Sequence, residues 1–345
     1  MRRLDPRLRS ALDAVLVLAA GVVVIDHLAR QVDFGKIDLL FRFGQEAVVV
    51  FFFLSGFLIH ANERDRVAND LGGYAARWFL RIYPALVIAM LVSVAVLAYN
   101  GTLAERFHWQ DAACTLFALQ DASALKPGTI CGPFLDNSPL WSLSYELLFY
   151  ALYPLVLPFF LRAAGPAQHA IGLASLAFAV AYLAMPSHFL LLPAYFVIWW
   201  LGAAMAEAVD RGTARLTAIA VPLAYVLLTL GVWVAKVVAS GGIGALGTYP
   251  FLMVGHFLVA AIFTLIASSP LGPLLARAAR LVPAAAWAWL ASFSYGIYVL
   301  HNQLLIHWEV AKSWLGFALA FALLILLAWL SDNPINQAVR KWMKR

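Results

Sequence analysis

The chain has 345 residues, of which 63% are hydrophobic and only 12% are charged, and its mean hydropathy is +0.83. Soluble domains carry about 25% charged residues, so this composition excludes one, and the apolar residues come in runs long enough to cross a bilayer. The formal net charge of +6 is not gathered in a basic stripe with interleaved aromatic residues, so it indicates membrane topology and contact with anionic lipids rather than nucleic-acid binding.

The apolar runs predict an all-α polytopic membrane protein, a single domain over residues 1–345 with about ten transmembrane helices. Each crossing needs roughly 20 residues, and a helix is favoured because lipid offers no partner for a free backbone group. The first run is not a cleavable signal peptide, because it ends in Asp26-His27 and no small-residue cleavage site follows. The predicted helices are 11–29, 43–60, 79–99, 140–161, 169–186, 189–207, 216–236, 249–267, 284–304 and 313–331.

The basic residues predict the orientation. Seventeen of the 24 lysines and arginines fall in segments on the side of the N-terminus, and seven fall on the other side. The positive-inside rule therefore predicts both termini in the cytoplasm of a bacterium, with the longest loop, roughly residues 100–139, outside the inner membrane. Cys114 and Cys131 both fall in this loop, where an oxidising compartment would allow a disulfide. Two unpaired cysteines in an amphipathic loop are the alternative, and the sequence leaves both open.

Three titratable residues from three predicted helices share one depth near the outer surface. His27 ends the first helix, Glu146 lies about 10 Å inside the fourth, and His301 lies near the outer end of the ninth. Ionisable residues at membrane depth are costly and mark functional sites. The alternatives are interfacial histidines and a structural pairing of Glu146 with a neighbouring tyrosine or tryptophan. Four further histidines are interpreted as interfacial: His108, His169, His188 and His307.

Residues near the cytoplasmic ends of the predicted helices indicate a different chemistry. Arg77 and Arg81 are four residues apart and share a helical face, and arginine side chains suit phosphate oxygens. In the second helix, Ser55-Gly56 leaves room for a neighbouring backbone or a slender ligand. Ordinary positive-inside charge and simple helix packing are the respective alternatives. The acidic and histidine residues lack the spacing of metal ligands, so no metal site is predicted.

Six segments in order now resemble one known family. The run LDAVLVLAAGVVVIDH is similar to its first helix, which ends in a catalytic histidine, and VVVFFFLSGFLI and RWFLRIYP are similar to its second-helix and third-helix signatures. NSPLWSLSYELLFYALYP, SYGIYVLH and the ending Asp332-Asn333-Pro334 follow in the family's order. From about Leu12 to Pro334, the chain resembles the membrane acyltransferase family three, the integral-membrane O-acyltransferases of bacterial surface polysaccharides.

The resemblance implies a membrane O-acyltransferase with no bound cofactor. Its donor substrate would be cytoplasmic acyl-CoA, most often acetyl-CoA, and its acceptor a hydroxyl of an extracytoplasmic glycan or glycoside. His27 would be the general base or would carry the acyl group, and Glu146 would orient a histidine by analogy with hydrolytic triads. The substrate-binding residues would be Arg77, Arg81, Ser55, Gly56, Trp141 and His301.

The chain departs from the family at two places. The family's arginine eleven residues before the histidine is Leu16 here, and its second-helix Gly-Val-Asp is Ala47-Val48-Val49. The missing arginine raises one alternative, a non-catalytic relative in a glycan-assembly complex. A proton-coupled transporter or flippase of glycan intermediates is the other. Against transport, the sequence has no internal repeat and no pair of interrupted helices at corresponding positions.

Overall fold

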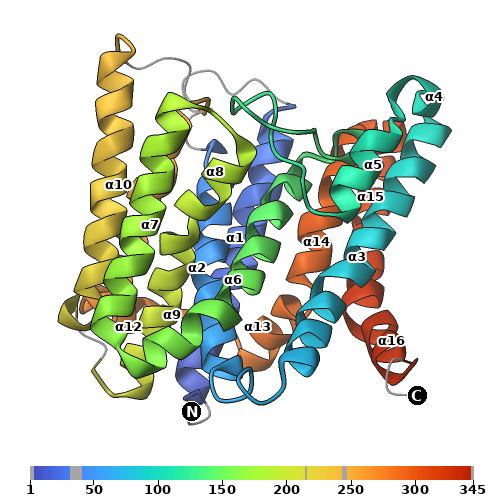
Figure 1. The fold of residues 1–345 in the computed structure, drawn as a ribbon. Helices are drawn as coiled ribbons and strands as arrows, with labels where there is room; N and C mark the ends of the chain where they lie inside the picture. The colour runs from blue at the N-terminus through green and yellow to red at the C-terminus, as the bar shows by residue number, and fades with distance from the viewer. Residues whose placement is uncertain (1–3, 32–40, 214–215, 243–246, 343–345) are drawn as a thin grey trace.

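The computed structural model describes residues 4–31, 41–213, 216–242 and 247–342, and these residues form an all-α bundle. Helix α1 begins and helix α16 ends at the same end of the bundle, called here the N-terminal end (Figure 1). The opposite end, called the loop end, carries the long segment between α3 and α6. The longer helices are α1 (Pro6–Ala29), α2 (Gly44–Glu63), α3 (Leu71–Tyr99), α6 (Leu143–Arg162), α7 (Ala164–Ala184), α9 (Phe196–Asp210), α10 (Ala220–Ala239), α11 (Phe251–Ser268) and α15 (Trp314–Leu330).

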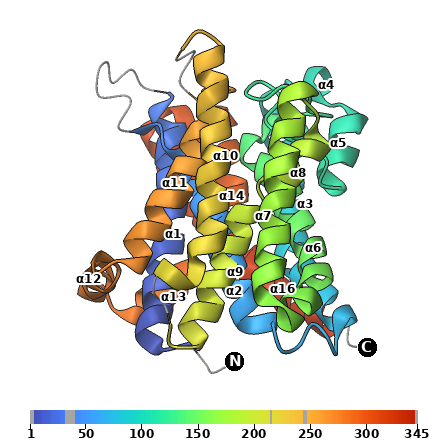
Figure 2. The same cartoon turned by 60° about the vertical axis from the view of Figure 1, so that its left-hand side comes forward.

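Short helices complete the described chain. They are α4 (Leu103–Arg106), α5 (Trp109–Leu116), α8 (His188–Ala194), α12 (Leu271–Ala278), α13 (Ala284–Ala291), α14 (Ser294–His301) and α16 (Asn336–Trp342). Helix α12 projects sideways from the bundle near the N-terminal end, whereas α4 and α5 lie at the loop end (Figure 2).

Nine helical stretches in the described residues are long and apolar enough to cross a membrane, so the chain is a multi-pass membrane protein. The ninth predicted helix, 284–304, is not continuous. Helix α13 ends at Ala291, α14 begins at Ser294, and the backbone turns π-helical over Asn302–His307. The break frees amide groups at the start of α14, and the Asp332 carboxylate accepts a hydrogen bond from the Gly296 amide at 2.8 Å.

Helices α2 and α9 form the centre of the bundle, where nearly every residue of α9 is buried. Two glycines allow their backbones to touch. A Cβ added to Gly56 would overlap the carbonyl oxygen of Trp199, and one added to Gly202 would overlap that of Phe53. Small residues at such contacts are the usual means by which membrane helices pack, because lipid gives apolar surfaces little reason to associate. For Gly56, helix packing therefore accounts for the glycine.

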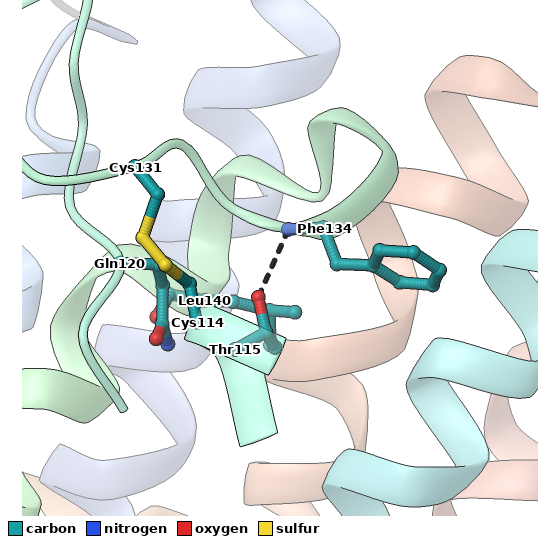
Figure 3. Close-up of a disulfide and its surroundings, with 6 residues drawn as sticks. All are labelled: Cys114, Thr115, Gln120, Cys131, Phe134 and Leu140. Atoms are coloured by element: carbon teal, nitrogen blue, oxygen red, sulfur yellow. Dashed lines mark hydrogen bonds between the residues drawn. A yellow bond between two sulfur atoms is a disulfide. The ribbon is translucent and has the colours of Figure 1, made fainter. Parts of the chain in front are cut away.

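The loop end is folded rather than extended. Cys114 and Cys131 are joined by a disulfide, which selects one of the two alternatives left open by the sequence (Figure 3). Beside it, the Thr115 hydroxyl accepts a hydrogen bond from the Phe134 amide at 3.0 Å, as Figure 3 shows. The disulfide and this bond fix the segment that leads into α6.

This segment is also attached to the interrupted ninth predicted helix. Asn137 donates a side-chain hydrogen bond to the Val299 carbonyl at 2.9 Å, and Gln303 donates one to the Leu135 carbonyl at 2.8 Å. Asn302 donates to the carbonyl of Asp136 at 3.1 Å. The loop therefore holds the end of α14, next to His301, in a fixed position.

Candidate functional site

A cavity of about 380 Å³ lies at the N-terminal end of the bundle. Helices α1, α2, α3, α14 and α16 and the π-helical turn at 331–335 contribute to its wall. Exposed Asn62 and Arg340 are among the lining residues, so the cavity opens to the surface at this end. The side chains that bear charge are Glu63, Arg77, Arg81, Asp332 and Arg340.

A second, narrower chamber of about 50 Å³ continues inward from the first cavity. Leu16 and Arg81 line both spaces, as do Ser294 and Tyr295, so these residues mark the junction. The far wall of the chamber includes Tyr298, whose hydroxyl bonds to Ser142 at 2.9 Å. The chamber therefore leads from a polar entrance toward the middle of the bundle.

The two arginines predicted from the sequence differ in their surroundings. Both line the first cavity, as their spacing on one helical face requires. The guanidinium of Arg77, however, is bound to the Glu63 carboxylate at 2.6 and 2.9 Å and to Asp70 at 2.9 Å. Arg81 has no ion pair or hydrogen bond within the described residues. The carboxylates of Glu146 and Asp332 lie near Arg81 without direct contact to it, so its guanidinium is open to a phosphate or carbonyl group that enters the cavity.

His27 and His301 meet at the loop end of the bundle. His27 Nδ1 lies 2.9 Å from His301 Nε2, and the two rings are stacked with centroids 4.9 Å apart. His301 is completely buried, whereas His27 is partly accessible. Neighbouring Asp26 turns away and pairs with Arg30 at 2.9 Å, as its angle on the helix predicts. The sequence placed these two histidines at one depth, and in the structure their side chains are in contact.

Glu146 does not join the two histidines. Its carboxylate accepts a long hydrogen bond, 3.5 Å, from the Tyr150 hydroxyl and lines the inner chamber together with Arg81. Tyr298 and Phe51, whose ring centroids are 5.8 Å apart, form part of the chamber wall, and the Tyr298 ring lies 6.4 Å from that of His301. The expectation that Glu146 orients a catalytic histidine finds no contact to support it, since depth along a helix does not specify which way a side chain faces.

The remaining predicted residues divide between chamber and core. Ser55 lines the inner chamber and bonds to Tyr150 at 2.9 Å. Gly56 lines neither cavity and packs on Trp199. Trp141 also lines neither cavity, because it is buried beneath the Lys126 ammonium, which lies 3.6 Å from its ring centroid. Of these three, only Ser55 lines one of the two cavities.

A buried polar cluster at the loop end was not predicted. Asp121 binds Lys126 at 2.8 Å and accepts a hydrogen bond from Tyr145 at 2.6 Å, and His188 lies 3.3 Å away. Burial raises the pKa of Asp121, but the Lys126 ammonium and the hydrogen bonds prevail and bring this pKa to about 2. The interpretation of His188 as interfacial is wrong, since its side chain is buried in this cluster. Lys126 and Asp121 look like loop charges in the sequence, and only the folded loop brings them together.

Comparison with known proteins identifies the family to which the chain belongs. A family model described as an acyltransferase domain matches residues 9–332, nearly the whole chain. Acyltransferase MdmB of Streptomyces mycarofaciens is 32% identical over 145 residues, which cover 40% of this chain and 36% of that protein. The alignment thus spans about a third of the length of that relative. No solved structure matches the chain.

Proposed function

This chain belongs to the membrane acyltransferase family three, and we propose that it transfers an acyl group, acetyl above all, from cytoplasmic acyl-CoA to a hydroxyl of an extracytoplasmic glycan or glycoside. It is a membrane-bound acyltransferase. The observation that carries the finer proposal is the arrangement of two half-sites, an arginine-lined cavity at one end and a histidine pair at the other, separated by an aromatic wall.

Two features support an extracytoplasmic loop end. The disulfide between Cys114 and Cys131 suits an oxidising compartment such as the bacterial periplasm. The opposite end carries most of the arginine and lysine residues, as cytoplasmic segments do. With this orientation, the 380 Å³ cavity faces the cytoplasm, where acyl-CoA is made, and the histidine pair faces the acceptor.

The dimensions of the two spaces suit an acyl-CoA. The first cavity, at the N-terminal end, has the volume and the arginines to receive the polar, phosphate-bearing part of a donor. The inner chamber of about 50 Å³ holds only a few non-hydrogen atoms, since one water needs ~10–15 Å³ on this scale. This favours a short acyl group such as acetyl. Arg81 stands at the junction that Leu16 also lines, and we propose that it replaces the arginine that the family carries at the position of Leu16.

The reaction then needs two proton transfers, one onto His27 and one from it. His27 accepts the proton of the acceptor hydroxyl while the hydroxyl oxygen attacks the thioester carbonyl. The bond from carbonyl carbon to sulfur breaks, and the proton passes from His27 to the departing thiolate, which leaves as CoA. For the two substrates to meet, the wall formed by Phe51 and Tyr298 has to open.

The reaction class is tested on surface glycans from cells with and without this gene. We expect deletion to remove the mass of one acyl group per glycan repeat, and mild alkali to remove the same mass from the wild-type glycan because esters are base-labile. Glycans of identical mass in both strains would contradict the proposal. Vesicles that move a glycan intermediate without acyl-CoA would instead support transport.

A substitution of Arg81 tests the donor half-site. We expect Arg81→Gln to raise KM for acyl-CoA about 10–100-fold, because a charged hydrogen bond contributes about 1.5–3 kcal/mol. KM for the acceptor should not change. The matched control is Arg162→Gln, since Arg162 is exposed at the same end of the bundle and lines neither cavity. An unchanged KM for acyl-CoA in Arg81→Gln would exclude this residue from donor binding.

A further inference from the structure

The hydrogen bonds of His301 determine where its proton lies. His301 Nδ1 is 2.8 Å from the carbonyl oxygen of Tyr298 and 3.1 Å from that of Ile297. A carbonyl oxygen can only accept a hydrogen bond, so His301 Nδ1 must carry a hydrogen. In a neutral imidazole the other nitrogen then has none. His301 Nε2 is therefore an acceptor.

This assignment fixes the proton of His27 as well. His301 Nε2 is 2.9 Å from His27 Nδ1, and an acceptor at that distance requires a donor opposite it. His27 therefore carries its hydrogen on Nδ1, and its Nε2 has the free lone pair. His27 Nε2 has no hydrogen-bond partner among the described residues, and the His27 side chain is partly accessible from the loop end.

A doubly protonated His301 would reverse the assignment, and its surroundings disfavour it. His301 is fully buried, and within the described chain its hydrogen bonds are to two carbonyls and to His27, with no carboxylate among them. An unpaired buried cation is costly. The neutral form of His301 is the one that these surroundings permit.

We propose that His301 is a positioning residue which holds His27 as the Nδ1–H tautomer, so that His27 Nε2 is the base that takes the proton from the hydroxyl of the glycan substrate. This inference rests on the proposed acyl transfer. His301 has the place that a carboxylate occupies in hydrolytic triads, where the third residue fixes the tautomer and steadies the imidazolium that forms. When His27 Nε2 takes the proton of the substrate hydroxyl, His27 becomes positively charged. This charge strengthens the hydrogen bond that its Nδ1–H donates to His301. The proton then leaves from the same Nε2 to the thiolate, and His27 returns to its starting form.

The first test compares two substitutions of His301. Leucine fills similar space but accepts no hydrogen bond, so we expect His301→Leu to lower kcat about 10⁴-fold, by analogy with the loss of the third residue of a triad. Glutamine offers an amide oxygen to the Nδ1–H of His27, so His301→Gln should keep kcat within about tenfold of wild type. KM for acyl-CoA should stay unchanged in both. Size-exclusion profile and melting temperature show that both variants are folded.

The second test observes the proton itself and needs no activity. Nitrogen-15 NMR of histidine-labelled protein separates the two tautomers, and comparison with His27→Gln identifies the His27 signal. We expect the Nδ1–H form in the wild type and in His301→Gln, and its loss in His301→Leu. An Nε2–H form in the wild type, or equal kcat in the leucine variant and the wild type, would overturn the proposal. If acyl transfer itself is absent from the wild type, the proposed function fails and the NMR result still decides the tautomer.

Discussion

His27→Gln is expected to lower the rate of acyl transfer by about 10³–10⁴-fold while the protein still folds and inserts. General-base catalysis contributes about 10²–10⁴-fold, and glutamine cannot take a proton at neutral pH. The substitution keeps an amide that can still bond to His301, so the histidine pair loses its basicity rather than its packing. The measurement is the initial rate of CoA release from acyl-CoA by purified protein with a crude glycan acceptor.

The matched control for this loss is His169→Gln. His169 is an exposed histidine on α7 that bonds to the Tyr225 hydroxyl, and it lines neither cavity. Its substitution should leave the rate within about twofold of wild type, as surface changes usually do. A His27→Gln enzyme that transfers acyl groups at the wild-type rate would remove His27 from the mechanism.

Gly202→Ala is expected to destabilise the fold by roughly 1–3 kcal/mol, and by more if the backbones cannot separate. The added Cβ would overlap the Phe53 carbonyl oxygen, and this carbonyl belongs to the central helix α2 and cannot rotate away. Because α2 also carries Ser55 and the chamber wall, a shift of this helix should lower both melting temperature and activity. Thermal unfolding in detergent, followed by circular dichroism, measures the change.

The control substitution is expected to change the stability in the opposite direction. Gly231 lies within α10, and a Cβ added there meets open space. Gly231→Ala should stabilise the protein by up to about 1 kcal/mol, because alanine is the better helix former. If Gly202→Ala and Gly231→Ala shift the melting temperature equally and in the same direction, the close contact between α2 and α9 is not what requires glycine.

The positions of the helices were largely predictable because an apolar run of about 20 residues has few other solutions in lipid. The prediction of one continuous helix over 284–304 was wrong, and the reason is also physical. Hydropathy registers the apolar content of residues 284–304 but not the break at Ser292-Phe293 or the π-helical turn after His301. Both depend on distant groups, since Asp332 receives the freed amide of Gly296 and Gln303 donates to the loop.

The candidate site was also predictable only in part. His27 and His301 could be placed together because both lie near one end of their helices, and depth alone brings them to one level. Glu146 shares the depth range but faces the inner chamber, since rotation about the helix axis is set by packing that one sequence does not reveal. The freedom of Arg81 and the pairing of Arg77 likewise depend on where Glu63 and Asp70 fold.

The wall made by Phe51 and Tyr298 has a consequence for the energetics of the membrane itself. A protein that passes a chemical group from one face of the bilayer to the other would short-circuit the ion gradients if its route were a water-filled conduit. Here the wall of the inner chamber includes the rings of Phe51 and Tyr298, and the hydroxyl of Tyr298 is held by Ser142. In the proposed reaction the acyl group is small, uncharged and bound to a carrier, so it would cross such a barrier during a brief opening that hydrated ions would not follow. With the proposed reaction, such a barrier would keep turnover of the enzyme from dissipating the membrane voltage.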